Sequence, residues 1–180
     1  NGTLRLTGEV EVTGGPLASG GRYGGSLSVH DGVLQIMGGA NVAADHVAVL
    51  NGGRLEVDGP GTTLVSDTEA RDYSLDVGAE GHGELAITGG AVVTSEWSDV
   101  GATATNIIGA HGLAPYEGKA TVTSAGSTWN ASRLHIGTRG GDGELTISDG
   151  GAVSGEGGYI GYGSLSSPSF GSRSSTGRVA

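Results

Sequence analysis

Gly83–Val93 reads GELAITGGAVV, and Gly143–Val153 reads GELTISDGGAV, sixty positions further along the chain. Both stretches open with Gly and Glu, alternate apolar with other residues, and reach a pair of glycines before a short apolar run. Weaker copies begin at Gly8, Gly32, Gly53 and Gly118, and partial copies begin at Gly2 and Gly177. Repetition at intervals of about 20 to 35 residues indicates a stack of similar units, in which most residues serve the scaffold.

The repeats alternate with a period of two, which is typical of β-strands with one buried face. In GELTIS, Leu145 and Ile147 share one face, while Glu144 and Thr146 share the other. A Gly-rich corner and a second short strand follow, and a third strand then ends in Gly, as in SLDVG at 74–78, RLHIG at 133–137 and YIG at 159–161. Three strands per unit predict a coil in which each turn pairs in parallel with the next, about 4.8 Å along the axis. About seven such coils fit the chain.

The alternation also predicts the core. We expect one continuous buried column formed by the apolar residues of the strongest repeats: Leu85, Ile87, Leu134, Ile136, Leu145 and Ile147. Trp129 lies within the repeat motif AGSTWN, at the position that Leu64 holds in an earlier unit, so core packing is favoured over ligand stacking. Trp97 lies between Glu96 and Asp99, which favours a place at the surface.

Composition excludes several classes of protein. The chain has 180 residues, of which 38 are Gly, against a usual share of about 7%. Only four Pro are present and Gly does not recur in triplets, so a collagen helix is excluded. The net charge of −10 argues against binding to nucleic acid or anionic lipid. The sequence has no run of 18 apolar residues, as a membrane-spanning helix needs, and no Cys, which suits an exported protein stabilised by stacking without excluding the cytosol.

We expect one domain over residues 1–180, with insertions at about 67–73, 102–117 and 164–176. The chain opens on a strand and stops within one, so we expect it to be a segment of a longer protein. Insertions in a stacked repeat map to external loops, which often carry function.

The stretch GKATVTSAGSTWNASRLHIGTRGGDGELTISDGGAVS, at Gly118–Ser154, resembles the passenger-domain repeats of autotransporter proteins of Gram-negative bacteria. The likeness is close over 118–161, good over 53–101 and weaker before residue 52. It implies an all-β fold, a single right-handed parallel β-helix (β-solenoid) of about seven three-stranded rungs with Gly-rich corners and little or no helix. It also implies secretion to the outer membrane and cell surface. That family carries adhesins, autoaggregation proteins, proteases and toxins on one scaffold, and its membrane barrel has no counterpart in this sequence.

No metal or cofactor is expected. The five His show no ligand spacing, and GGDGE at 140–144 occurs once, with Glu144 where a calcium-binding repeat needs Asp. The carboxylates of Asp67, Glu69 and Asp72, beside Arg71, could serve a polysaccharide-cleaving β-helix, but three charges in a short insertion are more typical of a solvated loop.

The sequence therefore predicts a non-enzymatic, extracellular, structural and adhesive β-helical stalk that attaches to host or sister cells. A filament or matrix subunit that polymerises by end-to-end strand pairing is the alternative, and a polysaccharide-active enzyme is a third. Expected partners are a protein or glycan of a host surface or sister cell, or a second copy, without nucleic acid or membrane insertion. The residues expected to bind lie in two insertions: Asp67, Glu69, Arg71, Asp72, Tyr73, His111, Tyr116 and Glu117.

Overall fold

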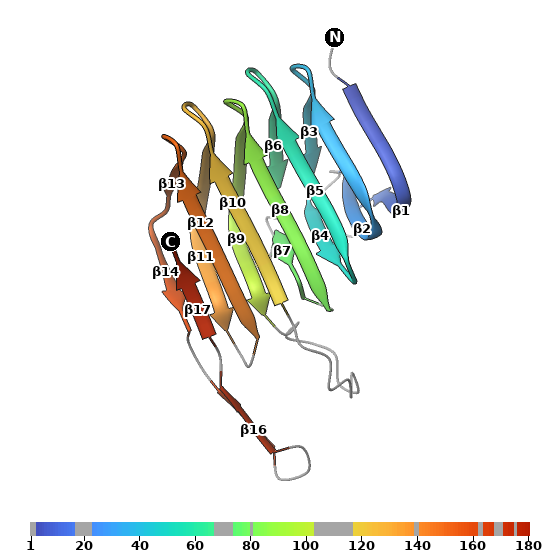
Figure 1. The fold of residues 1–180 in the computed structure, drawn as a ribbon. Coiled ribbons are helices and arrows are strands. Elements are labelled where there is room, and N and C mark those ends of the chain that lie inside the picture. The colour runs from blue at the N-terminus through green and yellow to red at the C-terminus, as the bar shows by residue number, and fades with distance from the viewer. Residues whose placement is uncertain are drawn as a thin grey trace.

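A computed structural model describes the backbone of residues 3–16, 23–66, 74–79, 81–102, 117–138, 141–161, 164–167, 171–174 and 176–180. This described part is all-β and contains no helix, as the sequence predicts. Within it, no helix is long and apolar enough to cross a membrane. Fifteen of the strands join into one continuous sheet that is almost entirely parallel (Figure 1).

Three parallel series of strands build this sheet, and we call them the first, second and third faces. The first face contains residues 33–37 of β2 (Tyr23–Met37), followed by β5 (Gly53–Asp58), β8 (His82–Thr88), β10 (Glu117–Thr123), β12 (Asp142–Ser148) and β17 (Thr176–Val179). Its register aligns Gly53, Gly83, Gly118, Gly143 and Gly177, which are the repeat starts read from the sequence. Figure 1 shows these strands as a row of arrows side by side.

The other two faces use the strands between these repeats. The second face contains β3 (Asn41–Ala44), β6 (Thr63–Ser66), the first part of β9 (Val92–Ala102), the first part of β11 (Thr128–Thr138) and β13 (Ala152–Ser154). The third contains residues 26–30 of β2, β4 (His46–Leu50), β7 (Leu75–Val77), the second parts of β9 and β11, and β14 (Gly157–Ile160). Successive strands along the chain thus belong to different faces, which is the arrangement expected of a β-solenoid.

The N-terminal strand departs from the repeat. β1 (Thr3–Pro16) runs antiparallel to β2 and covers both of its halves, with Leu6 opposite Leu34 and Val12 opposite Leu27. The copies read at Gly2 and Gly8 therefore lie on one long antiparallel strand rather than on parallel turns of the stack. An antiparallel strand can hydrogen-bond the edge of the first turn while running back along it, so it closes that edge.

The insertions expected from the sequence meet different outcomes. Residues 67–73 lie outside the described part, as do residues 103–116, whereas Ala102 and Glu117 are the ends of strands β9 and β10. Within the segment expected at 164–176, β15 (Ser164–Ser167) and β16 (Gly171–Ser174) pair as an antiparallel hairpin. A hairpin of two short strands thus occupies part of the segment where a loop was expected.

The core lies between the three faces. Leu85, Ile87, Ile136 and Leu145 are buried, and Leu134 and Ile147 are partly buried and pack against the core. The expectation that all six form one column is wrong, because strand pairing separates them. Leu85 and Leu145 share one register position of the first face, Ile87 and Ile147 share another, and Leu134 and Ile136 belong to the third face.

The double glycines form the corner between the first and second faces. Gly89 and Gly90 have φ of 61° and 87°, and the N–H of Ala91 donates to the carbonyl of Thr88 at 3.1 Å. Positive φ at both central positions is the requirement of a type I′ turn, which glycine meets without a Cβ clash. The corner is closed by a buried hydroxyl of the neighbouring turn, since the N–H of Gly90 donates to Ser127 Oγ at 3.0 Å. Thr62 accepts from Gly39 N–H in the same way, at 3.0 Å.

Candidate functional site

Seven of the eight residues expected to bind a partner lie outside the described residues. They are Asp67, Glu69, Arg71, Asp72, Tyr73, His111 and Tyr116. Glu117, the eighth, is the exposed first residue of β10, and its N–H donates to the carbonyl of Gly81 at 2.9 Å. The structure thus places Glu117 in the strand stack.

Glu117 belongs to a ladder of charged side chains across the outer surface of the first face. His82 Nδ1 lies 3.7 Å from Glu117 Oε2, and His82 Nε2 lies 3.1 Å from Glu84 Oε1. Arg54 donates from Nη1 to Glu84 at 2.8 Å and from Nε to Glu56 at 2.6 Å. These contacts join β5, β8 and β10, so the ladder ties neighbouring turns together.

The ladder shifts the pKa of its acids. The hydrogen bond from His82 is the largest cause that lowers the pKa of Glu84, and Arg54 adds to it. The pKa of Glu56 is lowered chiefly by the hydrogen bond that Gln35 Nε2 donates at 2.6 Å. The pKa of Arg54 is raised, first by its hydrogen bond to Glu56. Each shift favours the charged form that makes the contact.

We expect acid to weaken the fold through this ladder. A carboxylate with a lowered folded-state pKa stabilises the protein above its unfolded pKa, here about 4.5, and loses that contribution as the pH falls through its folded value. Urea unfolding of the protein and of a Glu84→Gln variant between neutral pH and pH 3 (roughly one and a half units below the unfolded value) measures this. The difference in unfolding free energy between them should shrink below the unfolded pKa. Glu156→Gln, at an exposed position outside the ladder, is the control; a Glu84→Gln difference that is constant with pH contradicts the assignment.

Hydroxyl groups occupy the neighbouring outward positions of the first face. Thr88 Oγ1 donates to Asp58 Oδ1 at 2.5 Å, and Ser148 Oγ donates to Thr123 Oγ1 at 3.0 Å. Both bonds run from one strand to the next, as Arg54–Glu84 and His82–Glu117 do in the ladder. These side chains of the first face therefore help to hold the stack together.

A polar group also lies within the core. Trp129 is fully buried, as its repeat position predicts, and register aligns it with Leu64, Val93 and Val153 on the second face. Its Nε1–H donates to Ser95 Oγ at 2.9 Å, and Ser95 Oγ lies 2.6 Å from Ser98 Oγ. The indole therefore acts as a packing residue whose one polar atom is satisfied.

The sequence analysis missed a cluster on the outer surface of the third face. The guanidinium carbon of Arg133 lies 4.5 Å from the centroid of the Trp97 ring. The rings of Trp97 and His135 meet edge to face with centroids 6.2 Å apart, and the centroids of His135 and Tyr159 are 5.2 Å apart. The signal was present in the Gly-ended third strands, because WSDVG at 97–101 aligns with RLHIG at 133–137. Aligning these strands would have placed the four side chains on one surface.

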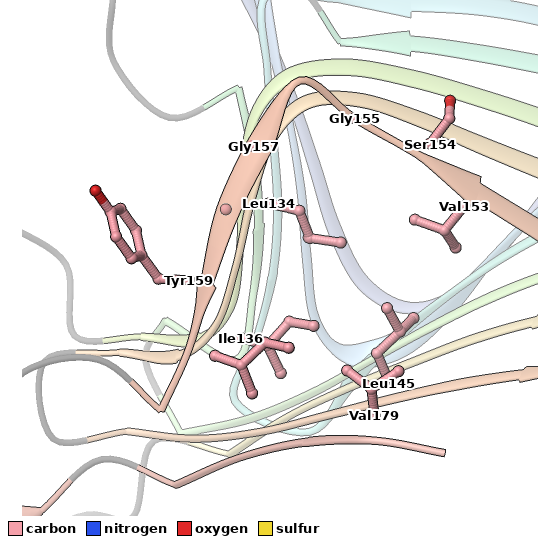
Figure 2. A pocket seen from close by; sticks show the side chains of 11 residues that line it. Leu134, Ile136, Leu145, Val153, Ser154, Gly155, Gly157, Tyr159 and Val179 are labelled. Carbon is pink, nitrogen blue, oxygen red and sulfur yellow. The ribbon is translucent and has the colours of Figure 1, made fainter.

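An apolar opening lies at the end of the stack farthest from β1. It measures about 300 Å³ and lies between β12, β13, β14 and β17. Figure 2 shows Leu134, Ile136, Leu145, Val153 and Val179 gathered there, whereas Tyr159 points away on the other side of β14. The opening is continuous with the core, so its lining is the interior of the last turn.

Among the described residues, no group of three or more His, Asp or Glu side chains is placed to hold a metal ion. Three described acids instead contact neighbouring strands: Glu56 accepts from Gln35, Glu84 pairs with Arg54, and Asp58 accepts from Thr88. Comparisons with known protein families, with curated proteins and with solved structures find no match to this chain.

Proposed function

We propose that this chain is a non-enzymatic structural and adhesive segment of a bacterial cell-surface protein, built as a single right-handed parallel β-helix of about seven rungs. The observation that supports it best is the direction of the outward contacts. Ion pairs and hydroxyl bonds of the first face run from strand to strand at Arg54–Glu84, His82–Glu117 and Ser148–Thr123, and contacts in this direction stabilise a rod. The likeness of Gly118–Ser154 to autotransporter passenger repeats adds the surface location.

In this proposal the insertions 67–73 and 102–117 bind a protein or glycan of a host or sister cell. The repeat positions already serve packing, corners and strand-to-strand contacts, which leaves the insertions free to vary with the partner. The net charge of −10 favours neutral or basic partners, whose ionic contacts weaken as salt rises.

Register indicates how to remove each insertion without disturbing the stack. Ser66 pairs with Ser95, and Leu75 pairs with Ser98. Replacing 67–73 by one Glu leaves two residues between Ser66 and Leu75, as there are between Ser95 and Ser98. Thr138 pairs with Ala102, and Asp142 with Glu117, so replacing 103–116 by Arg-Gly-Gly copies the shorter connection at 139–141.

We expect both shortened variants to fold and at least one to lose adhesion to cells or matrix. Circular dichroism and unfolding midpoints check the fold, and counting attached particles coated with each variant checks adhesion. If both variants fold normally and attach as the parent chain does, the insertions are not the binding surface.

A filament subunit is the second candidate, favoured by the apolar edge at the end of the stack. Val179 is 45% exposed and Ile160 is 59% exposed, and no described strand pairs beyond β13, β14 and β17. A strand of another copy could pair with this edge. Sedimentation velocity over a range of protein concentrations separates the two candidates, because only a filament subunit forms larger assemblies as its concentration rises.

A further inference from the structure

The third face changes character along the axis. One register column of its backbone runs from Ala48, which is buried, through positions 76 and 99 to His135 and Tyr159. Because Ala48 and Asp76 occupy the same column, parallel stacking does not itself require rings there. The later turns instead present the aromatic cluster, which we define as Trp97, Arg133, His135 and Tyr159.

The aromatic cluster is continuous and accessible. Its rings and guanidinium lie in contact across β9, β11 and β14, with centroid separations of 6.2 Å and 5.2 Å between successive rings. Tyr159 is 52% exposed, Arg133 is also exposed, and Trp97 and His135 are half-buried. Keeping a phenol ring in water leaves apolar surface unburied, and a partner that covers it gains that burial.

We propose that the aromatic cluster binds a neutral oligosaccharide chain lying along the third face. A sugar ring presents a C–H surface that can pack on an aromatic face, and hydroxyl groups at its rim. Tyr159 supplies both an apolar ring and a hydroxyl, and Arg133, held over the indole of Trp97, offers several N–H donors from a fixed position. A row of rings spaced along the axis suits an extended chain of sugar units.

Charge and size favour a neutral glycan over other occupants. The net charge of −10 disfavours an acidic ligand, and the cation of Arg133 already covers the indole that a basic peptide would seek. A typical protein partner would need roughly 20 to 30 residues on each side, far more than these four side chains. The four residues of the aromatic cluster are not among the residues of the insertions 67–73 and 102–117, so each set can be substituted by itself.

The test uses the whole 180-residue chain. Isothermal titration calorimetry with cellohexaose, xylohexaose, mannohexaose and chitohexaose, at low and high salt, measures binding. Hyaluronan fragments and an Arg-rich peptide serve as acidic and basic probes. We expect at least one neutral hexasaccharide to bind with little dependence on salt. Tyr159→Ala and Trp97→Ala should each weaken it about tenfold or more, equivalent to about 1.4 kcal/mol.

The control is Val65→Ala, which removes an exposed apolar side chain from the second face (Val65 is 37% exposed). It should leave the affinity unchanged, and unfolding midpoints confirm that each variant is folded. Failure of all four neutral sugars to bind at millimolar concentration overturns the proposal. So does exclusive binding of the acidic or basic probe, or unchanged sugar affinity in both aromatic variants. Cell adhesion of the shortened-insertion variants is scored separately, so the two proposals can fail independently.

Discussion

Replacing Gly118 by Ala is expected to prevent the chain from folding stably. A Cβ at this position would collide with the backbone nitrogen of Gly101 and the carbonyl oxygen of Val77, and would lie 2.8 Å from the carbonyl carbon of Val100. These are main-chain atoms of β7 and β9, which cannot rotate away as a side chain can. Relief would require separating paired strands.

The requirement at Gly118 is for space rather than for an unusual backbone angle. Gly118 is not among the residues with positive φ, so other residues could adopt its conformation. The same close approach occurs at Gly53, Gly83 and Gly143, which share its register column and whose Cβ atoms would also meet backbone. The glycine that opens each repeat is thus explained by the backbone at the end of the third-face strands, which passes too close to leave room for a Cβ.

Two other glycines allow the effect of a steric clash to be separated from the effect of a positive φ. At Gly61, with φ of 75°, a Cβ would meet nothing within 4 Å, so Gly61→Ala should cost only the left-handed strain of about 1 to 2 kcal/mol. At Gly157 a Cβ would also meet nothing within 4 Å, and φ is not positive, so Gly157→Ala should change little. Urea unfolding followed by circular dichroism measures all three variants. Equal stability of the Gly118→Ala and Gly157→Ala variants would contradict the close approach.

The repeat pattern predicted much of the fold because the causes of its strands and corners are local. The opening glycines were visible as a recurring pattern, although their cause, the close approach of backbone from other strands, is not local. The alternation of Leu145 and Ile147 and the corner Gly89–Gly90 reflect strand and turn geometry that a short window of sequence carries. The antiparallel direction of β1 was missed for the opposite reason. The residues of β1 alternate like those of any other repeat. Whether the strand runs parallel or antiparallel depends on which edge of the sheet is free to pair with it, and a short window of sequence does not contain that information.

The candidate binding surface was predicted less well than the core. Leu64, Val93 and Trp129 share a column because burial imposes one kind of side chain, and this made Trp129 recognisable. Outward positions carry no such constraint, so Trp97, Arg133 and Tyr159 are recognised as neighbours only when the Gly-ended third strands are aligned in the register of β9, β11 and β14. The insertions offered charge and length alone, neither of which specifies a partner.

Replacing Trp129 by Ala is expected to lower the free energy of unfolding by about 3 to 5 kcal/mol, as removal of a large aromatic side chain from a core does. The indole is fully buried, and the same turn contains Ala120 at the position where its neighbours have Leu85 and Leu145. A close-packed core relaxes only in part around such a deletion, so a cavity should remain where the indole was.

The cavity, rather than the lost hydrogen bond, should dominate this loss. When the indole is removed, Ser95 Oγ still lies 2.6 Å from Ser98 Oγ, so its hydroxyl keeps a partner. Ser95→Ala alone should therefore cost less than Trp129→Ala, and Trp129→Phe, which keeps one ring, should fall between the parent chain and Trp129→Ala.

Urea unfolding followed by far-ultraviolet circular dichroism is the suitable measurement, because the substitution removes one of only two tryptophans and with it the fluorescent signal of the core. Trp97→Ala is the matched control. Trp97 is half-buried and its stacked cation is worth about 0.5 to 1 kcal/mol at an exposed site, so its loss should be several-fold smaller. If the two Trp→Ala variants lose equal stability, Trp129 does not fill the core of the stack. A Trp129→Ala loss within the stated range, with an unchanged urea dependence, would show that one indole supports the packing between the three faces while the stack remains intact.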